Sequence, residues 1–185
     1  PLCALFSGPL LIWFYRRYAG PHADDAPFAA KVAKGTLHCG AGCALADLIC
    51  ENLAHYVPGV LAYFGLGTIF STEIFAVWTM DYVFALLTGI VFQYFAIAPM
   101  RDLSVGEGVM AAAKADVLSL TSWQVGMYGS MGLAHFILFP AFVGDKVDAG
   151  SPVFWAAMQM AMLAGFASAY FPNWFLIRSG LKEEM

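Results

Sequence analysis

Charge is what this sequence has least of. Only 12% of its 185 residues are charged, with 9 Lys and Arg against 13 Asp and Glu, whereas soluble proteins carry about 25% charged residues. Hydrophobic residues make up 61% of the chain and aromatic residues 16%, and the mean hydropathy is +0.70. A chain so poor in charge is not built for a water-exposed surface. The composition therefore predicts an integral membrane protein whose main partner is the lipid bilayer.

Clustered basic residues are missing as well. The formal net charge is −4, and the few Lys and Arg residues are scattered over several loops. Because phosphate binding needs a basic patch or stripe, we expect no nucleic-acid partner.

Catalytic motifs are also lacking. The sequence contains no Gly-x-Ser-x-Gly, no zinc-protease motif and no phosphate-binding loop, so an enzyme is the less favoured class. Paired histidines at haem spacing are absent, although His38, His55 and His135 remain open as ligands from separate helices. No cleavage pattern follows the apolar start. Since the chain opens at Pro1 without Met, we expect its first span to be the tail of a longer helix.

Long apolar runs, in contrast, are plentiful. A transmembrane helix needs about 20 predominantly apolar residues, and we expect spans at residues 2–15, 36–66 with a kink at Pro58, 71–98 ending at Pro99, 109–139 ending at Pro140, and 152–177 capped by Ser151. The predicted fold is an all-α polytopic membrane helix bundle of about five transmembrane helices. Residues 1–35 would form an N-terminal transmembrane helix with a cytoplasmic connector, and residues 36–185 a four-helix membrane domain.

The positions of the cations predict the orientation. With five spans, one side of the membrane holds a single cation, Lys146, and the other side holds Arg16, Arg17, Lys31, Lys34, Arg101, Arg178 and Lys182. Cytoplasmic loops carry the excess of Lys and Arg. We therefore expect a cytoplasmic C-terminus.

Residues 38–43, which read His-Cys-Gly-Ala-Gly-Cys, form the most reactive stretch. Cys39, Cys43 and Asp47 step by four and so share one helix face. An ionisable side chain is costly in hydrocarbon and usually faces a bundle interior or a wet cavity. His38 is offset from Cys39 by about 100° on a regular helix, so it would join them only if the helix start were bent or unwound.

A second stripe of candidates follows one face of the span 109–139. It contains Asp116, Gln124, Met127, Met131 and His135. Imidazole, thiolate and thioether ligands suit Cu(I) and Zn(II), although methionines more often fill gaps in a core and His135 would more often serve a helix-to-helix hydrogen bond. The predicted metal ligands are His38, Cys39, Cys43, Asp47, Asp116, Met127, Met131 and His135, with copper as the expected ion and zinc as the alternative.

Polar residues of different spans also fall at matching depths, at 1.5 Å of rise per residue. The inner half of the membrane would hold Cys43, Asp47, Gln93, Lys114, Asp116, Ser119 and Asn173, and the level nearer the midplane would hold Glu51, Asp81, Thr88 and Gln124. Farther out would lie Met127, Met131 and Met158, and near the outer mouth Glu73 and His135. The sequence predicts how deep in the membrane each polar residue lies. It does not predict whether the helix faces that carry these residues meet in the bundle.

Several of these motifs together resemble a known family. They are His38-Cys39-x-x-Gly42-Cys43-x-x-x-Asp47, Gly89-Ile90-x-Phe92-Gln93-Tyr94-Phe95, Lys114-Ala115-Asp116, Gly126-Met127, Pro172-Asn173-Trp174 and Gly180-Leu181-Lys182. This pattern resembles a bacterial polytopic membrane family, domain of unknown function 4396, marked by a His-Cys-Thr motif. The resemblance covers residues 36–185 and implies a four-helix core in the bacterial inner membrane, but no activity. Gly40 stands where the Thr of the motif would stand, so any role of that hydroxyl is absent.

Three functions remain open at this stage. The favoured one is a membrane protein that binds or moves a transition metal such as copper. The second is an accessory, non-catalytic subunit of a larger membrane complex, or a homo-oligomer, in which polar groups serve helix association. The third is a membrane thiol-redox enzyme using Cys39 and Cys43. A reducing cytoplasmic location and the distortion needed to bridge positions four apart on a helix count against the third.

Overall fold

A computed structural model describes residues 2–18, 25–101, 104–144 and 147–182, and every regular element in these ranges is helical. The long helices are α1 (Ala4–Tyr18), α2 (Phe28–Tyr56), α3 (Glu73–Arg101), α4 (Val105–Leu133) and α6 (Pro152–Arg178). The short ones are the 3-10 helix η2 (Pro58–Phe64), the π-helix η3 (Ala134–Leu138) and α5 (Phe139–Phe142).

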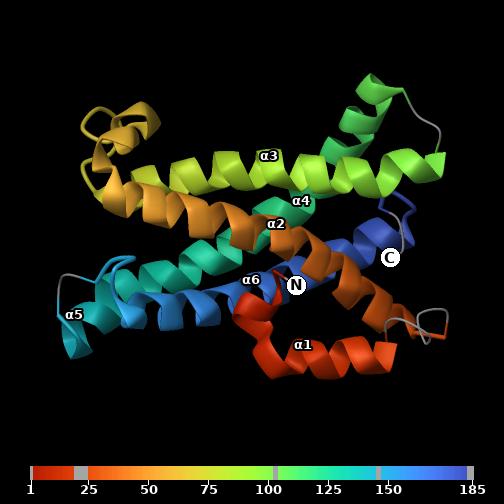
Figure 1. The fold of residues 1–185 in the computed structure, drawn as a ribbon, viewed down its shortest axis with the longest axis horizontal. Coiled ribbons are helices and arrows are strands. Elements are labelled where there is room, and N and C mark those ends of the chain that lie inside the picture. The colour runs from red at the N-terminus through yellow and green to blue at the C-terminus, as the bar shows by residue number, and fades with distance from the viewer. Residues whose placement is uncertain (1, 19–24, 102–103, 145–146, 183–185) are drawn as a thin grey trace.

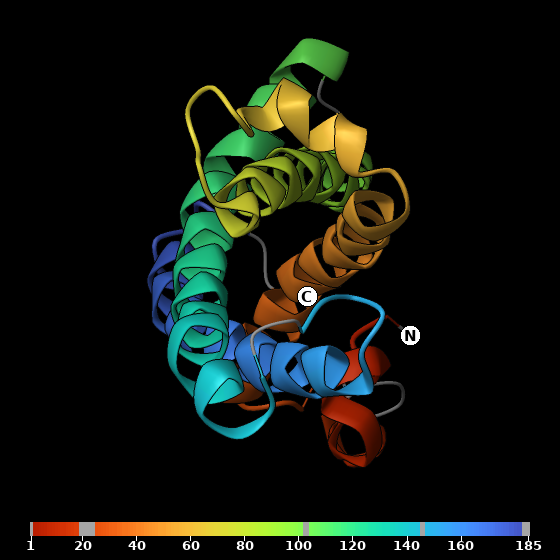
Figure 2. The same ribbon diagram turned by 90° about the vertical axis from the view of Figure 1, so that its left-hand side faces the viewer.

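Four of the long helices form the bundle. α2, α3, α4 and α6 run alternately in opposite directions around a shared interior, and α1 lies along its edge (Figures 1 and 2). One end of the bundle carries η2 and α5. The opposite end carries the connection from α3 to α4 and the end of α6. The all-helical fold predicted from the apolar runs is confirmed.

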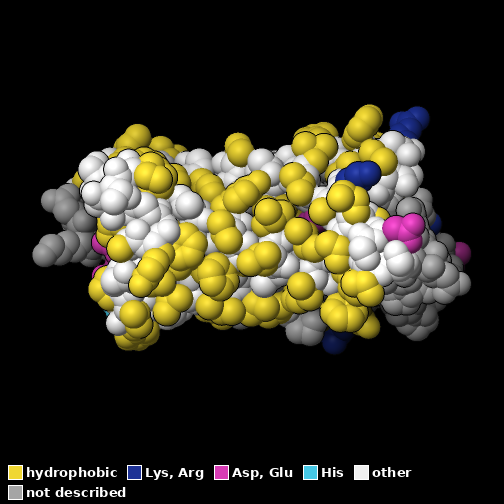
Figure 3. All heavy atoms as spheres, turned by 90° about the horizontal axis from the view of Figure 1, so that it is seen from above, with side chains coloured by type: hydrophobic (Ala, Val, Ile, Leu, Met, Phe, Trp, Pro, Cys, Tyr) yellow, Lys and Arg dark blue, Asp and Glu magenta, His cyan; other side chains and the backbone are white. Residues whose placement is uncertain are grey.

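Three helical segments among the described residues are long and apolar enough to cross a bilayer: Glu73–Phe95, Val105–Phe142 and Pro152–Arg178. Hydrophobic side chains cover the middle of the face drawn in Figure 3, and its Lys and Arg side chains gather toward one end. α1 has only 15 residues and breaks at Gly8. α2 has 29 residues, but it is too polar to be counted with the other three.

Part of the polarity of α2 comes from residues that face the interior. Thr36, Asp47 and Glu51 are all buried. Its length, about 43 Å at 1.5 Å per residue, matches that of its neighbours in the bundle.

Two predicted boundaries of α2 are wrong. The helix begins at Phe28, directly after Pro27, and not at residue 36, which lies inside it. It also ends at Tyr56 and does not run on through a kink to residue 66. Pro58 cannot donate a backbone hydrogen bond and disfavours helical geometry at the residue before it. Val57 accordingly leaves helical geometry with φ −132°, and a 3-10 turn follows.

α4 differs from expectation at both ends. It starts at Val105 on a capping box, in which Ser104 Oγ accepts from the Glu107 N–H and Glu107 Oε2 accepts from the Ser104 N–H at 3.2 Å. Beyond Leu133 the helix does not stop at Pro140. It widens into the π-turn η3 and continues through Pro140 in α5, with the Phe139 N–H donating to the Ala134 carbonyl.

Small residues allow helices of the bundle to approach one another closely. A Cβ on Gly42 would lie 3.5 Å from the Gly89 backbone, so α2 and α3 cross closely there. Thr88 Oγ1 donates across the same crossing to the Gly42 carbonyl at 3.3 Å. Such small-residue contacts are typical of helix pairs in membranes.

Candidate functional site

Buried polar side chains from all four bundle helices form what we call the polar column. It consists of Glu51, Asp47, Asp81, Cys43, Cys39, Asp116, Ser119, Asn173 and Lys182, and each of these residues is at least nine-tenths buried. The column joins α2, α3 and α4 to the end of α6. Its members are connected in pairs, from the η2 end of the bundle to the end of α6.

A thiol and a carboxylate meet in the middle of the polar column. Cys39 Sγ on α2 donates to Asp116 Oδ1 on α4 at 3.3 Å. The Cys43 thiol lies beside Cys39 and within electrostatic reach of both Asp47 and Asp116. A Cβ on Gly89 of α3 would overlap the Asp116 carboxylate. The absence of a side chain at Gly89 therefore lets three helices close around one acid.

Three acids lie nearer the η2 end. Asp47 and Asp81 are 1% and 0% exposed, and none of their four carboxylate oxygens has a hydrogen-bond partner in the described part of the chain. Asp81 lies within reach of Asp47, Glu51 and the Cys50 thiol. Native structures leave few buried polar groups without partners. An interior with several such groups is suited to protons, water or a cation.

Further unpartnered groups border the column. Among the described residues, the side-chain amides of Gln93 and Gln124, the indole N–H of Trp123 and one oxygen of Asp116 have no hydrogen-bond partner. An amide or carboxylate without a partner in a dry core is costly. The interior thus offers both acceptors and donors to a polar occupant.

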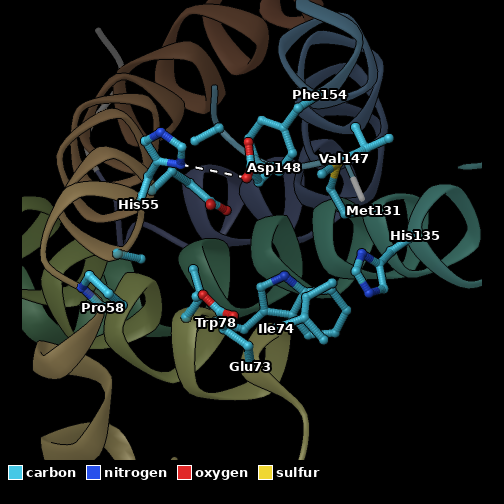
Figure 4. A pocket seen from close by; sticks show the side chains of 14 residues that line it. His55, Pro58, Glu73, Ile74, Trp78, Met131, His135, Val147, Asp148 and Phe154 are labelled. Carbon is cyan, nitrogen blue, oxygen red and sulfur yellow. Dashed lines mark ion pairs between the residues drawn. The ribbon is translucent and has the colours of Figure 1, made fainter. Parts of the chain in front are cut away.

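A cavity of about 350 Å³ opens at the η2 end, and we call it the vestibule. Its ionisable lining comes from α2, α3, η3 and the segment before α6: Glu51, His55, Glu73, His135 and Asp148. His55 Nδ1 lies 3.6 Å from Asp148 Oδ2 on one side, whereas Glu73 and His135 stand on the other (Figure 4). Glu51 belongs to both the vestibule and the polar column, so the two are connected.

Several predicted ligands are brought together and others are not. Cys39, Cys43, Asp47 and Asp116 meet in the polar column, while Met127 and Met131 share the buried core with both cysteines. Met131 also lines the vestibule with His135.

His38 does not join the cysteines. α2 begins ten residues before it and is regular through residues 38–43, so no unwound start turns the imidazole toward Cys39. Its ring lies instead beside Phe92 on α3, with centroids 6.2 Å apart. Lys114 also stays outside the column and is exposed.

The predicted ligands do not form a closed metal site. Within the described ranges, no three His, Cys, Asp or Glu side chains are placed to hold one ion. They are distributed along the bundle, with four in the column and His135 in the vestibule.

Sequence reasoning missed Lys182, which it counted among the cations on one side of the membrane. The side chain is 2% exposed and belongs to the polar column. A usable signal was present: Gly180 follows the last residues of α6, and a glycine just after a helix commonly turns the chain back on it.

Comparison with known proteins identifies the family of this chain. A family model described as a domain of unknown function (DUF4396) matches residues 30–182. The chain belongs to this family. The DUF4396 match runs from α2 to the turn after α6, and so includes the whole polar column and vestibule. No curated protein and no solved structure matches the chain. The membership in this family, noted from the sequence motifs, is thereby confirmed over residues 30–182.

Proposed function

We propose that this DUF4396 protein binds and moves a transition metal ion, such as copper, along the polar column of its membrane bundle. One observation carries the proposal: the unpartnered carboxylates of Asp47 and Asp81, with Asp116 beyond them, lie in sequence between an acidic vestibule and the far end of α6. Ionisable groups inside membrane helices typically mark ion routes.

The charges favour a cation. The vestibule is lined by three acids and two histidines, and the column adds Asp47, Asp81 and Asp116 beyond Glu51. A lining of one sign attracts the opposite ion and raises its local concentration.

The sulfur ligands favour a soft or borderline metal. Cys39 and Cys43 lie between the acids of the column, and the thioethers of Met127 and Met131 are in the same buried core. Thiolate and thioether ligands select Cu(I) and Zn(II) over hard cations. A row of partial sites suits movement, because conduction requires that an ion bind at several sites and leave each of them.

The proposal includes a membrane arrangement. We place α2 across the bilayer together with α3, α4 and α6, in the bacterial inner membrane, with the end of α6 on the cytoplasmic side. The excess of Lys and Arg at that side supports this orientation.

The decisive experiment measures metal content and uptake. The detergent-purified protein, loaded with Cu(I) or Zn(II), is compared with the Cys39→Ser, Cys43→Ser double variant by elemental mass spectrometry, and both are tested for metal uptake in proteoliposomes. Cys3→Ser is the matched control, since Cys3 is a buried cysteine outside the column, with its thiol donating to the Leu37 carbonyl.

We expect bound metal in the wild type and in Cys3→Ser, and a loss of about tenfold or more in affinity in the double variant, equivalent to about 1.4 kcal/mol or more. Metal retained by a folded double variant would overturn the assignment of the thiols. No metal and no uptake in the wild type would overturn the function, and membrane subunits copurifying with it would then support the accessory-subunit alternative.

A further inference from the structure

The chain turns back on itself after α6 and buries a lysine. Gly180 has φ +71°, and the backbone N–H groups of Leu181 and Lys182 donate to the Leu176 carbonyl at 3.0 and 3.1 Å. Glycine adopts such a left-handed conformation at little cost. Because of this turn, Lys182 points into the bundle, although lysines are almost never fully buried unless paired.

The ammonium of Lys182 is held by a specific network. Lys182 Nζ donates to Asn173 Oδ1 at 2.8 Å, and Asn173 Nδ2 donates to Ser119 Oγ at 2.6 Å. The ammonium also acts electrostatically on the Asp116 carboxylate and on the His38 ring. It therefore lies at the α6 end of the column, within electrostatic reach of the Asp116 carboxylate.

We propose that Lys182 is a tethered cation that closes the α6 end of the polar column. Its ammonium, held on Asn173, acts electrostatically on Asp116 as a mobile cation would, and it repels a second positive charge there. Passage to this end requires the turn at residues 179–182 to withdraw. The nature of the cargo rests on the proposed function, whereas the closure rests on the geometry of Lys182 alone.

The turn is suited to such a movement. Three of its four residues, Ser179, Gly180 and Leu181, are exposed, and its hydrogen bonds go to residues 173–177 at the end of α6. Segments with few buried contacts open locally at a small fraction of the global unfolding free energy. Withdrawal would leave α6 itself intact, because the helix ends at Arg178.

The buried cysteines provide a test that needs no metal. The full protein in proteoliposomes is treated, from the side that holds the end of α6, with a small membrane-impermeant thiol reagent carrying a positive charge and, in parallel, with a neutral reagent of similar size. Modification of each cysteine is followed by peptide mass spectrometry. The variants are Lys182→Met, Lys182→Arg as the conservative replacement, and Lys114→Met as the matched control at an exposed lysine.

In Lys182→Met we expect Cys39 and Cys43 to react about tenfold faster with the cationic reagent and less markedly faster with the neutral one. The variant removes the charge that repels a cation, and it also removes the hydrogen bond to Asn173 that holds the turn in place. Lys182→Arg and Lys114→Met should react like the wild type. Unchanged rates at Cys39 and Cys43 in Lys182→Met would overturn the proposal. Faster labelling of Cys3 and Cys50 to the same extent would also overturn it, because Lys182 would then act only as a structural cap.

The two proposals fail in different ways. A wild type without metal uptake whose Lys182→Met variant shows selective labelling would overturn the metal function and support the closure. If the wild type takes up metal but labelling is unchanged in Lys182→Met, the metal function is supported and the closure is overturned.

Discussion

At the scale of single residues, Gly40 shows how an absent side chain sets the packing of the core. Trp123 of α4 is fully buried, and its ring lies where a Cβ on Gly40 of α2 would be. Gly165 of α6 contacts the same indole. A Cβ added at Gly165 would lie only 2.8 Å from Trp123 Nε1. The absence of a side chain at Gly40 therefore has a packing reason in this chain.

Placing a threonine at position 40 should destabilise the protein. In Gly40→Thr the new side chain overlaps Trp123, and overpacking of this kind costs about 1–3 kcal/mol of unfolding free energy. Thermal unfolding in detergent measures the loss. Gly129→Ala is the control, because nothing lies within 4 Å of a Cβ at that helical glycine. Equal stability of the two variants would contradict the packing argument.

The sequence predicted individual residues well where only depth mattered. Glu73 and His135 were expected near one mouth and both line the vestibule. It failed for His38 and Lys182, since the direction of each depends on distant geometry. His38 depends on where α2 begins, and Lys182 on how the chain turns after α6.

At the scale of elements, the π-turn η3 is the most informative departure from the predicted helices. A proline removes one backbone donor and clashes with the preceding turn, and α4 meets Pro140 by widening over Ala134–Leu138. π-turns inside α-helices are frequent at functional sites. Here the widened turn carries His135 into the vestibule.

Removing the proline should change the exposure of position 135. With Pro140→Ala the Phe136 carbonyl regains its donor, the turn can tighten to α geometry, and the side chain at 135 rotates away from the vestibule. A cysteine placed by His135→Cys reports this change through its rate of modification by a membrane-impermeant thiol reagent.

We expect that rate to fall by about tenfold when Pro140→Ala is added. Helical content by circular dichroism should stay the same, because only one turn is repacked. An unchanged labelling rate would show that η3 does not depend on Pro140.

The helices themselves were predictable from apolar runs, and α6 matched its expected limits almost to the residue, with Ser151 accepting from the Val153 N–H at 3.2 Å. Boundaries failed at prolines. Pro58 ended a helix that was expected to bend, whereas Pro140 was absorbed into a helix that was expected to end. A proline leaves the carbonyl four residues earlier without its helical hydrogen bond. The local sequence does not show whether the surrounding structure lets the helix continue in spite of that loss.

At the scale of the whole molecule, four helices bring their polar faces to one interior. Matching depth along the chain was visible in the sequence, but the contact between Cys39 and Asp116 joins residues 77 positions apart. Such pairing depends on how the helices rotate against one another. The close crossing at Gly42 and Gly89 contributes to that rotation, and only the assembled bundle shows it.

The orientation in the membrane gives a prediction at the same scale. Ser71→Cys, at the vestibule end, should react with an impermeant thiol reagent added outside intact cells. Gly106→Cys, at the opposite end, should react only after the cells are opened. Both positions are exposed, and the reverse pattern would overturn the orientation drawn from the positive charges.

The polarity of α2 also bears on how the protein is made. Asp47 and Glu51 lie deep in that helix, and an acid at the centre of a membrane helix adds about 2.5–3.5 kcal/mol to the free energy of insertion. We therefore expect α2 on its own to insert poorly into the bilayer. α3 is the next long helix along the chain, after η2; it pairs with α2 at Gly42 and Gly89, and it is apolar enough to cross a bilayer. We expect the two helices to enter the bilayer together as one hairpin, so that the acids of α2 are shielded from lipid from the moment of insertion.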